Sequence, residues 1–143
     1  MIFTAQQRIV FIGDSITDCG RTGAAAPWGA GYVSMVRNLL TARYPELALT
    51  ILNRGVSGNT VRDLAARWEK DVVAERPDWL SVMIGINDCW RFFKGRAEEA
   101  VPLPEYETTL RRLLDRARTA TNARLILMTP YMIESDRTVA MRA

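Results

Sequence analysis

Four short apolar runs alternate along the chain with segments whose apolar residues recur at every third or fourth position. The runs are almost continuous in apolar character, which is typical of strands buried on both faces of a parallel sheet. They predict strands over Arg8–Ile12, Leu47–Leu52, Trp79–Ile84 and Arg124–Met128.

The segments between these runs have the spacing of helices that bury one face. They predict helices over Tyr32–Tyr44, Thr60–Ala74 and Pro104–Ala120, the second of which begins with the capping-box pattern T-V-R-D. Strands that alternate with helices imply right-handed crossovers and a three-layer α/β sandwich around a parallel sheet. We expect residues 1–143 to form one domain. A further helix is expected to begin within residues 135–143, so the fold resembles a doubly wound domain that ends after its fourth strand.

Three polar, glycine-bearing segments follow the first three predicted strands. They are GDSITD (residues 13–18), NRGVSGNT (residues 53–60) and GINDCW (residues 85–90). Ligands of open parallel sheets bind outside the carboxyl ends of the strands. We therefore expect the three segments to meet at one edge of the sheet and to form a site there.

The residue types in these segments are suited to acyl transfer. Ser15, on the tight turn after the first strand, is a candidate nucleophile, which would need a base to accept its proton. The backbone N–H groups of Ser15 and Gly58 and the side-chain amide of Asn87 are candidate donors to the oxyanion that forms on an attacked ester carbonyl. Together they predict catalysis through Ser15, Gly58 and Asn87.

Each of these residues also has a purely structural interpretation. Ser15 is a common residue type at helix N-caps, Gly58 is a common turn residue, and Asn87 and Asp88 are common in Asx turns. Asp14 and Asp18 are expected to cap or brace the first turn. It is the joint placement of the residues at three strand ends that favours the functional interpretation.

Gly13–Asp18, Gly58 and Gly85–Asp88 together resemble the first three sequence blocks of the GDSL esterases and lipases, the SGNH hydrolase superfamily. The stretches GYVSMV, NRGVSGNTVRDLAARWEKDVV, PDWLSVMIGINDCWR and LILMTPYMIE are similar to a narrower group, the bacterial acetylxylan esterases. The resemblance implies a flavodoxin-like sandwich with strand order 2-1-3-4-5, Ser15 as the nucleophile, and an oxyanion hole made by Ser15, Gly58 and Asn87. It implies no metal and no organic cofactor, and a short-chain ester, such as a carbohydrate acetyl ester, as the substrate.

The chain departs from this family in one respect, because it contains no histidine. The family has a late Asp-x-x-His motif that supplies the base, and we expect that this C-terminal portion is missing from residues 1–143. Ser15 would then be poorly activated in this chain alone. The alternative is a non-catalytic module that binds an acylated sugar, or a catalytically impaired fragment.

Composition adds mainly exclusions. The net charge of +3 is weak, and no aromatic residues interleave with the arginines near residues 111–118, so a nucleic-acid partner is not expected. Cys19 and Cys89 form no metal-binding pair and are expected to be reduced thiols. A metallophosphoesterase would need histidine ligands among its carboxylates, and the 143 residues contain no histidine, so this class of enzyme is not expected. No leader or membrane segment is recognised in the sequence, so a cytoplasmic location is expected. The sequence leaves open whether the protein forms a homo-oligomer. Four aromatic residues are candidates for a sugar platform or for packing: Trp28, Trp90, Phe92 and Phe93.

Overall fold

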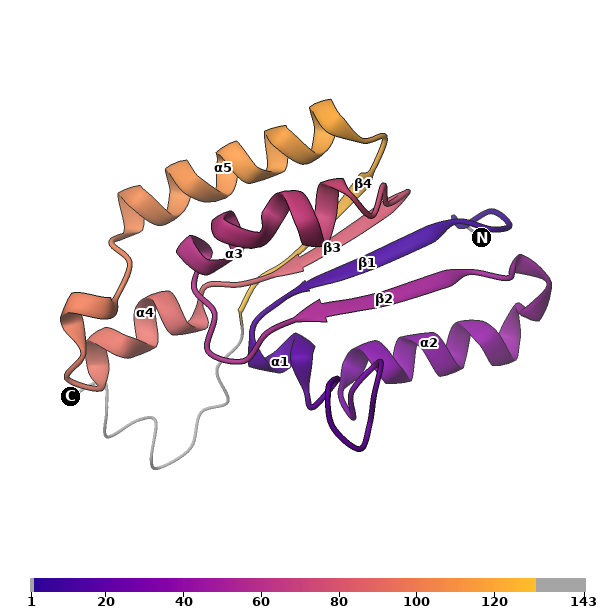
Figure 1. Cartoon of the computed structure of the whole chain (residues 1–143), viewed down its shortest axis with the longest axis horizontal. Helices are drawn as coiled ribbons and strands as arrows, with labels where there is room; N and C mark the ends of the chain where they lie inside the picture. The colour runs from indigo at the N-terminus through magenta and orange to yellow at the C-terminus, as the bar shows by residue number, and fades with distance from the viewer. Residues whose placement is uncertain (1, 131–143) are drawn as a thin grey trace.

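The computed structural model describes residues 2–130, which form a parallel sheet with helices on both faces (Figure 1). The strands pair in the order β2-β1-β3-β4, and every pairing is parallel. This is the order that the family resemblance implied for the first four strands. Their bounds are β1 Arg8–Gly13, β2 Thr50–Gly55, β3 Trp79–Met83 and β4 Arg124–Met128.

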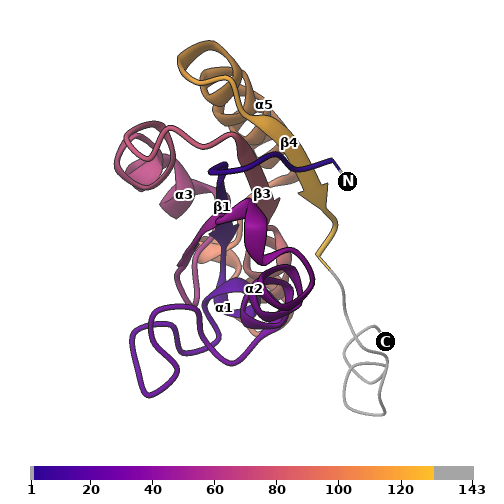
Figure 2. The same ribbon diagram turned by 90° about the vertical axis from the view of Figure 1, so that its right-hand side faces the viewer.

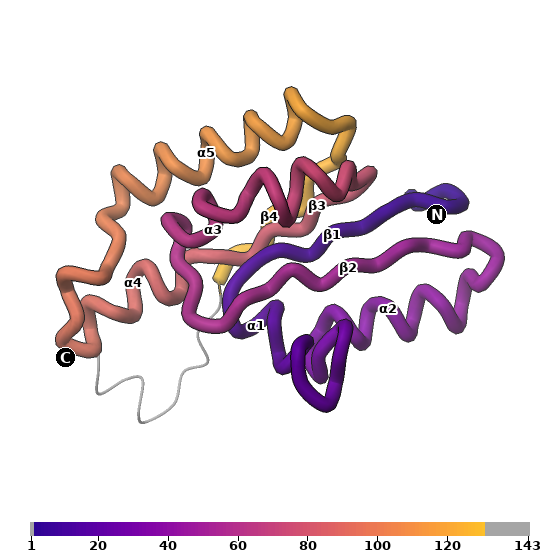
Figure 3. The backbone as a smooth tube through the Cα atoms, in the orientation of Figure 1, coloured from indigo at the N-terminus to yellow at the C-terminus, as the bar shows by residue number. Residues whose placement is uncertain are grey.

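Helices cover the sheet from two sides (Figure 2). Two of them, α3 and α5, lie on one face, and α1 and α2 lie on the other. Figure 3 follows the chain from β3 through α4, at the end of the sheet, into α5. The helices are α1 Ser15–Asp18, α2 Tyr32–Arg43, α3 Val61–Trp68, α4 Ile86–Phe93 and α5 Leu103–Ala120. Short 3-10 turns occupy Pro45–Leu47 and Ala97–Glu99, and a π-type turn over Glu69–Val73 extends α3.

The residues of β1 alternate between two hydrophobic cores. Val10 and Ile12 belong to the core under α3 and α5, whereas Ile9 and Phe11 belong to the core under α2. All four are buried because β1 is central and successive side chains of a strand point to opposite faces. The apolar runs of β1 and β3 therefore do reflect strands that are covered on both sides. The edge strand β4 does not meet this expectation, because its residues are only partly buried and Leu127 is 56% exposed.

The second strand differs from its predicted bounds of Leu47–Leu52, because it begins at Thr50 and continues to Gly55. Pro45–Leu47 forms a 3-10 turn instead, and Ala48 has a left-handed φ of 45° that ends it. At the other end the strand accommodates the polar residue Asn53, whose side-chain amide donates to the Thr17 and Trp28 carbonyls at 2.6 and 2.7 Å. These long-range partners cannot be seen in the apolar pattern.

The helix predictions were closer. The predicted capping box is present, since the backbone N–H of Thr60 donates to Asp63 Oδ2 at 2.8 Å and the Thr60 side chain accepts from the backbone N–H of Asp63. The predicted helix Thr60–Ala74 is α-helical only as far as Trp68 before the π-type turn. The two short helices α1 and α4 were not predicted. The helix expected within residues 135–143 lies outside the described residues.

Candidate active site

The carboxyl ends of β1, β2 and β3 meet at one edge of the sheet, where α1, α4 and the turn between β2 and α3 gather (Figure 1). The sequence-predicted residues all lie there. Ser15 is the first residue of α1, Gly58 lies in the β2–α3 turn (residues 56–60), and Asn87 lies in the first turn of α4. Parallel pairing of the three strands is what brings these segments to the same edge.

The β1–α1 junction (residues 13–16) buries Asp14 and exposes Ser15. Asp14 Oδ1 accepts a hydrogen bond from the Ile16 amide at 3.0 Å, so Asp14, and not Ser15, is the N-cap of α1. The side chain of Ser15 is therefore not used as the cap. It lines a cavity of about 530 Å³, together with Ile16, Cys19, Gly31, Tyr32, Met83 and Met128.

Asp18 braces this junction against the β2–α3 turn, as expected from the sequence. Its Oδ2 accepts from the Ser57 hydroxyl at 2.7 Å and from the Ser57 amide at 3.0 Å. Partial desolvation opposes ionisation of Asp18, but the hydrogen bonds from Ser57 and Arg21 outweigh it and lower the pKa of this carboxyl. Asp18 is thus a charged link between two of the three segments.

Gly58 has a φ of 82°, a left-handed conformation that favours glycine. Its carbonyl accepts a hydrogen bond from Arg91 Nη2 at 2.7 Å, which fixes the orientation of the turn. Within residues 2–130, no hydrogen bond engages the backbone N–H of Gly58 or that of Ser15. Both donors are therefore free for a ligand in this part of the chain.

The β3–α4 junction (residues 84–88) presents Asn87 half-exposed and Asp88 buried. Asn87 Nδ2 donates to the Asn59 carbonyl at 2.9 Å, while Asp88 Oδ1 accepts from the Val61 amide at 2.9 Å and so caps α3. Neither side chain forms a local Asx turn. The junction is instead tied to the β2–α3 turn, and within residues 2–130 the second N–H of Asn87 Nδ2 makes no hydrogen bond.

Two carboxyl groups lie buried beneath these exposed residues. Burial raises the pKa of Asp14 above its ordinary value of 3.8, although the Ile16 hydrogen bond acts against it. Burial also raises the pKa of Asp88, and the charge of Asp14 adds to that shift. The second carboxyl oxygen of each, Oδ2, is buried without a hydrogen-bond partner in the described part of the chain.

The aromatic candidates lie away from the Ser15 cavity. Trp28 Nε1 donates to the Ile51 carbonyl at 2.9 Å, which is a packing role beside β2. Phe92 and Phe93 line a separate, largely apolar cavity of about 760 Å³ that also contains Cys89 and Tyr106. Cys19 and Cys89 are both exposed free cysteines. The aromatic ring that does line the Ser15 cavity is that of Tyr32.

The sequence did not point to Arg67 or Arg91, whose guanidinium groups bond to main-chain carbonyls of the site segments. A charged residue on a helix is usually solvated, and its spacing gives no sign of such partners. Over residues 2–130, no group of three or more histidine, cysteine, aspartate or glutamate side chains is arranged to hold a metal ion. No helix in that range has both the length and the apolar character needed to cross a membrane.

Comparison with known proteins identifies the family of the chain. The GDSL-like lipase/acylhydrolase family matches residues 11–142, which is most of the sequence. The chain belongs to this family. The segments after β1, β2 and β3 can therefore be compared with those of other members of this family.

Among relatives in the family, an acetylxylan esterase from Geobacillus stearothermophilus is 51% identical, and the match covers 95% of this chain and 65% of that protein. The crystal structure of Axe2, an acetylxylan esterase from the same organism, superposes with a TM-score of 0.88 at 49% identity, over 99% of this chain and 68% of that one. LAE5, an alpha/beta hydrolase from the metagenome of Lake Arreo, has a TM-score of 0.87 at 46% identity, over 98% and 67% of the two chains. The chain thus spans about two thirds of the length of these proteins. Catalytic mutants of Axe2 in which a serine, an aspartate or a histidine is replaced by alanine are also similar in structure.

Proposed function

We propose that this chain belongs to a serine esterase that hydrolyses short-chain, chiefly acetyl, esters through an acyl-enzyme on Ser15. The observation that carries the proposal is the state of Ser15. Its hydroxyl is exposed on the first turn after β1, Asp14 takes the capping role, and its backbone N–H is free within residues 2–130. A serine at the N-cap would instead use its hydroxyl oxygen to accept a hydrogen bond from the first turn of the helix.

In the proposed reaction, Ser15 Oγ attacks the ester carbonyl carbon and gives up its proton to a base. Negative charge collects on the carbonyl oxygen, where the N–H groups of Ser15 and Gly58 and the Asn87 amide stabilise it. The C–O bond to the alcohol then breaks, and the alcohol leaves with a proton. Water hydrolyses the acyl-serine in the second half of the reaction and restores the Ser15 hydroxyl.

The base is the part of the mechanism that the 143 residues do not contain, since they include no histidine. We propose that an Asp-x-x-His pair outside this sequence accepts the proton of Ser15. The existence of catalytic mutants of Axe2 at a serine, an aspartate and a histidine supports such a set of three residues. Identity of 51% to an acetylxylan esterase supports an acetylated carbohydrate as the substrate.

The lack of histidine also favours a second candidate, a module that holds an acylated sugar without cleaving it. In that case the oxyanion donors would bind the ester carbonyl, and no acyl-enzyme would form. The two candidates differ in turnover and not in ligand class. They can therefore be separated with one substrate.

The experiment compares the wild-type protein in its natural form with Ser15→Ala and with the control Ser34→Ala, which removes a hydroxyl on α2. Hydrolysis of 4-nitrophenyl acetate and acetylated xylo-oligosaccharide should fall by about a thousandfold or more in Ser15→Ala only, because the nucleophile is lost. Full activity in Ser15→Ala would refute the esterase mechanism. Calorimetric binding of the oligosaccharide without any Ser15-dependent turnover would favour the binding module, and faster hydrolysis of long-chain esters would refute the acetyl preference.

A further inference from the structure

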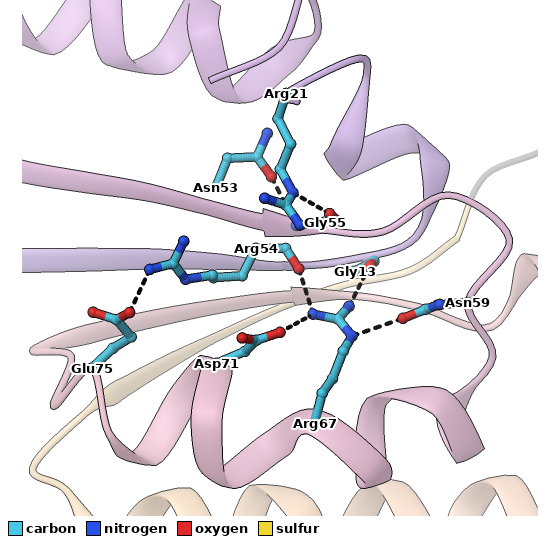
Figure 4. A network of polar contacts seen from close by, with 9 residues as sticks. All are labelled: Gly13, Arg21, Asn53, Arg54, Gly55, Asn59, Arg67, Asp71 and Glu75. Carbon is cyan, nitrogen blue, oxygen red and sulfur yellow. Dashed lines mark hydrogen bonds and ion pairs between the residues drawn. The ribbon is translucent and has the colours of Figure 1, made fainter. Parts of the chain in front are cut away.

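Arg67, in the last turn of α3, turns its side chain towards the carboxyl ends of β1 and β2 (Figure 4). Its side chain is only 16% exposed, and all three guanidinium nitrogens donate hydrogen bonds. Nη1 donates to the Arg54 carbonyl and to Asp71 Oδ2, both at 2.7 Å. Nη2 donates to the Gly13 carbonyl at 3.0 Å, and Nε donates to Asn59 Oδ1 at 2.7 Å.

These partners connect Arg67 to each of the three oxyanion donors. Gly13 is the last residue of β1 and lies two residues before Ser15, and Asn59 directly follows Gly58. The carbonyl of the same Asn59 accepts the hydrogen bond from Asn87 Nδ2 at 2.9 Å. Arg67 thus touches two of the segments directly and reaches the third through one residue.

We propose that Arg67 is a positioning residue that sets the relative placement of Ser15, Gly58 and Asn87, an inference that rests on the proposed esterase function. Oxyanion donors act only when they are held at the place where the charge develops. A planar guanidinium supplies donors in fixed directions to several acceptors, and Asp71 balances its charge. Lysine has one compact ammonium group and cannot replace this planar set.

The same helix provides a matched control. Arg62 forms a two-point contact with Glu105, with both distances at 2.6 Å, but its side chain is 45% exposed, and within residues 2–130 it makes no hydrogen bond to the site segments. Exposed pairs of this kind contribute little to stability. Arg67 and Arg62 are therefore the same residue type on the same helix, but Arg67 bonds to the site segments whereas Arg62 bonds to Glu105 of α5.

The test uses the natural protein with Arg67→Lys, Arg67→Met and Arg62→Met, and follows kcat and KM for 4-nitrophenyl acetate together with urea unfolding. Both Arg67 variants should lower kcat by about tenfold to a hundredfold while KM changes by less than about threefold, because displaced donors weaken binding of the transition state more than that of the ester. Arg67→Lys keeps a charge beside Asp71 and should retain more stability than Arg67→Met without regaining kcat. A kcat equal to that of Arg62→Met in both variants, or a loss of kcat explained entirely by the unfolded fraction, would overturn the proposal.

A second readout separates this proposal from the esterase assignment and covers an Arg67→Met protein that fails to fold. The side-chain amide resonances of Asn87 and the backbone amide of Gly58 are observed by NMR in wild type, Arg67→Lys and Arg62→Met. Shifted resonances and faster amide exchange in Arg67→Lys alone support the positioning role, even where Ser15→Ala shows that no Ser15-dependent hydrolysis exists. Unchanged resonances in Arg67→Lys overturn it, whatever the activity.

Discussion

The β1–α1 and β3–α4 junctions each place a buried aspartate beside an accessible candidate residue. Asp14 precedes Ser15, and Asp88 follows Asn87. In both, one carboxyl oxygen accepts a hydrogen bond from the N-terminal end of a helix. The helices differ, because Asp14 caps its own helix α1 through an amide two residues away, whereas Asp88 caps α3 through Val61, 27 residues earlier in the chain.

The difference shows that the unpaired N–H groups at the start of a helix can be capped by a neighbouring residue or by one far away in the sequence. The first N–H groups of a helix have no partner within it, and a carboxylate satisfies them and complements the helix dipole. Asp14 thereby orders one junction. Asp88 ties two together, so that the segments containing Gly58 and Asn87 are joined as a unit, and the Asp18–Ser57 contacts bring the Ser15 junction to them.

The largest effect should come from the β3–α4 junction. Asn87→Ala should lower kcat for 4-nitrophenyl acetate by about a hundredfold to a thousandfold, the usual loss for an oxyanion donor. Steady-state kinetics on the natural protein measure this, with the exposed α2 residue Asn38 changed to alanine as the control. A turnover equal to that of Asn38→Ala would mean that Asn87 only ties the segments together.

The next effect concerns the backbone of the β1–α1 junction. A Cβ on Gly13 would clash with the Met83 carbonyl oxygen and the Thr17 hydroxyl, whereas one on Gly23 would lie 3.5 Å from the nearest atom, the Gly20 carbonyl oxygen. Gly13→Ala should therefore lower the free energy of unfolding by about 1–3 kcal/mol, as overpacking does, and Gly23→Ala should change it little. Urea unfolding compares the two. Equal stability would show that the end of β1 can move away from β3 without cost.

The sequence allowed the local features of this fold to be predicted more reliably than the long-range ones. The four strands follow from apolar runs, and the Thr60–Asp63 capping box follows from four consecutive residues. The start of β2 was misplaced because Leu47 ends a 3-10 turn and Ala48 caps it in a left-handed conformation, although both residues belong to an apolar run that is typical of a strand. The short helix α1 has only four residues, too few to show a helical period. Most of the eight residues of α4 were instead interpreted as part of a polar, glycine-bearing segment after β3.

In the candidate site, too, local contacts could be predicted from the sequence and long-range contacts could not. Asp14 was expected to cap or brace its own turn and does so, since its partner is two residues away. The partners of Asp88 and Arg67 lie in other elements, so neither role could be recognised before the elements were assembled. The positions of Ser15, Gly58 and Asn87 at one edge were predictable because parallel strands end together.

The smallest effect compares the two buried carboxyl groups by their titration. Burial raises the pKa of both, so the folded protein keeps these protons to a higher pH than the unfolded chain does. Below pH 3.8, the ordinary pKa, both groups are protonated in the folded and the unfolded state, so they do not lower the free energy of unfolding. As the pH rises through the raised pKa, the buried groups must ionise and the free energy of unfolding falls. Asp88→Asn keeps an oxygen for the Val61 amide and removes this loss, so it should be more stable than wild type at pH 7, with a difference that shrinks towards pH 4.

Asp14→Asn should behave in the same way and should also lower the pKa of Asp88, because the charge of Asp14 contributes to that shift. The stabilisation in the double variant should therefore be smaller than the sum of the two single ones. Urea unfolding from pH 4 to 7 and NMR titration of the Asp88 carboxyl carbon measure both effects, with the exposed Asp115→Asn as the control. An additive double variant, or an Asp88 pKa that does not respond to Asp14, would show that the two junctions are electrostatically independent in spite of their shared design.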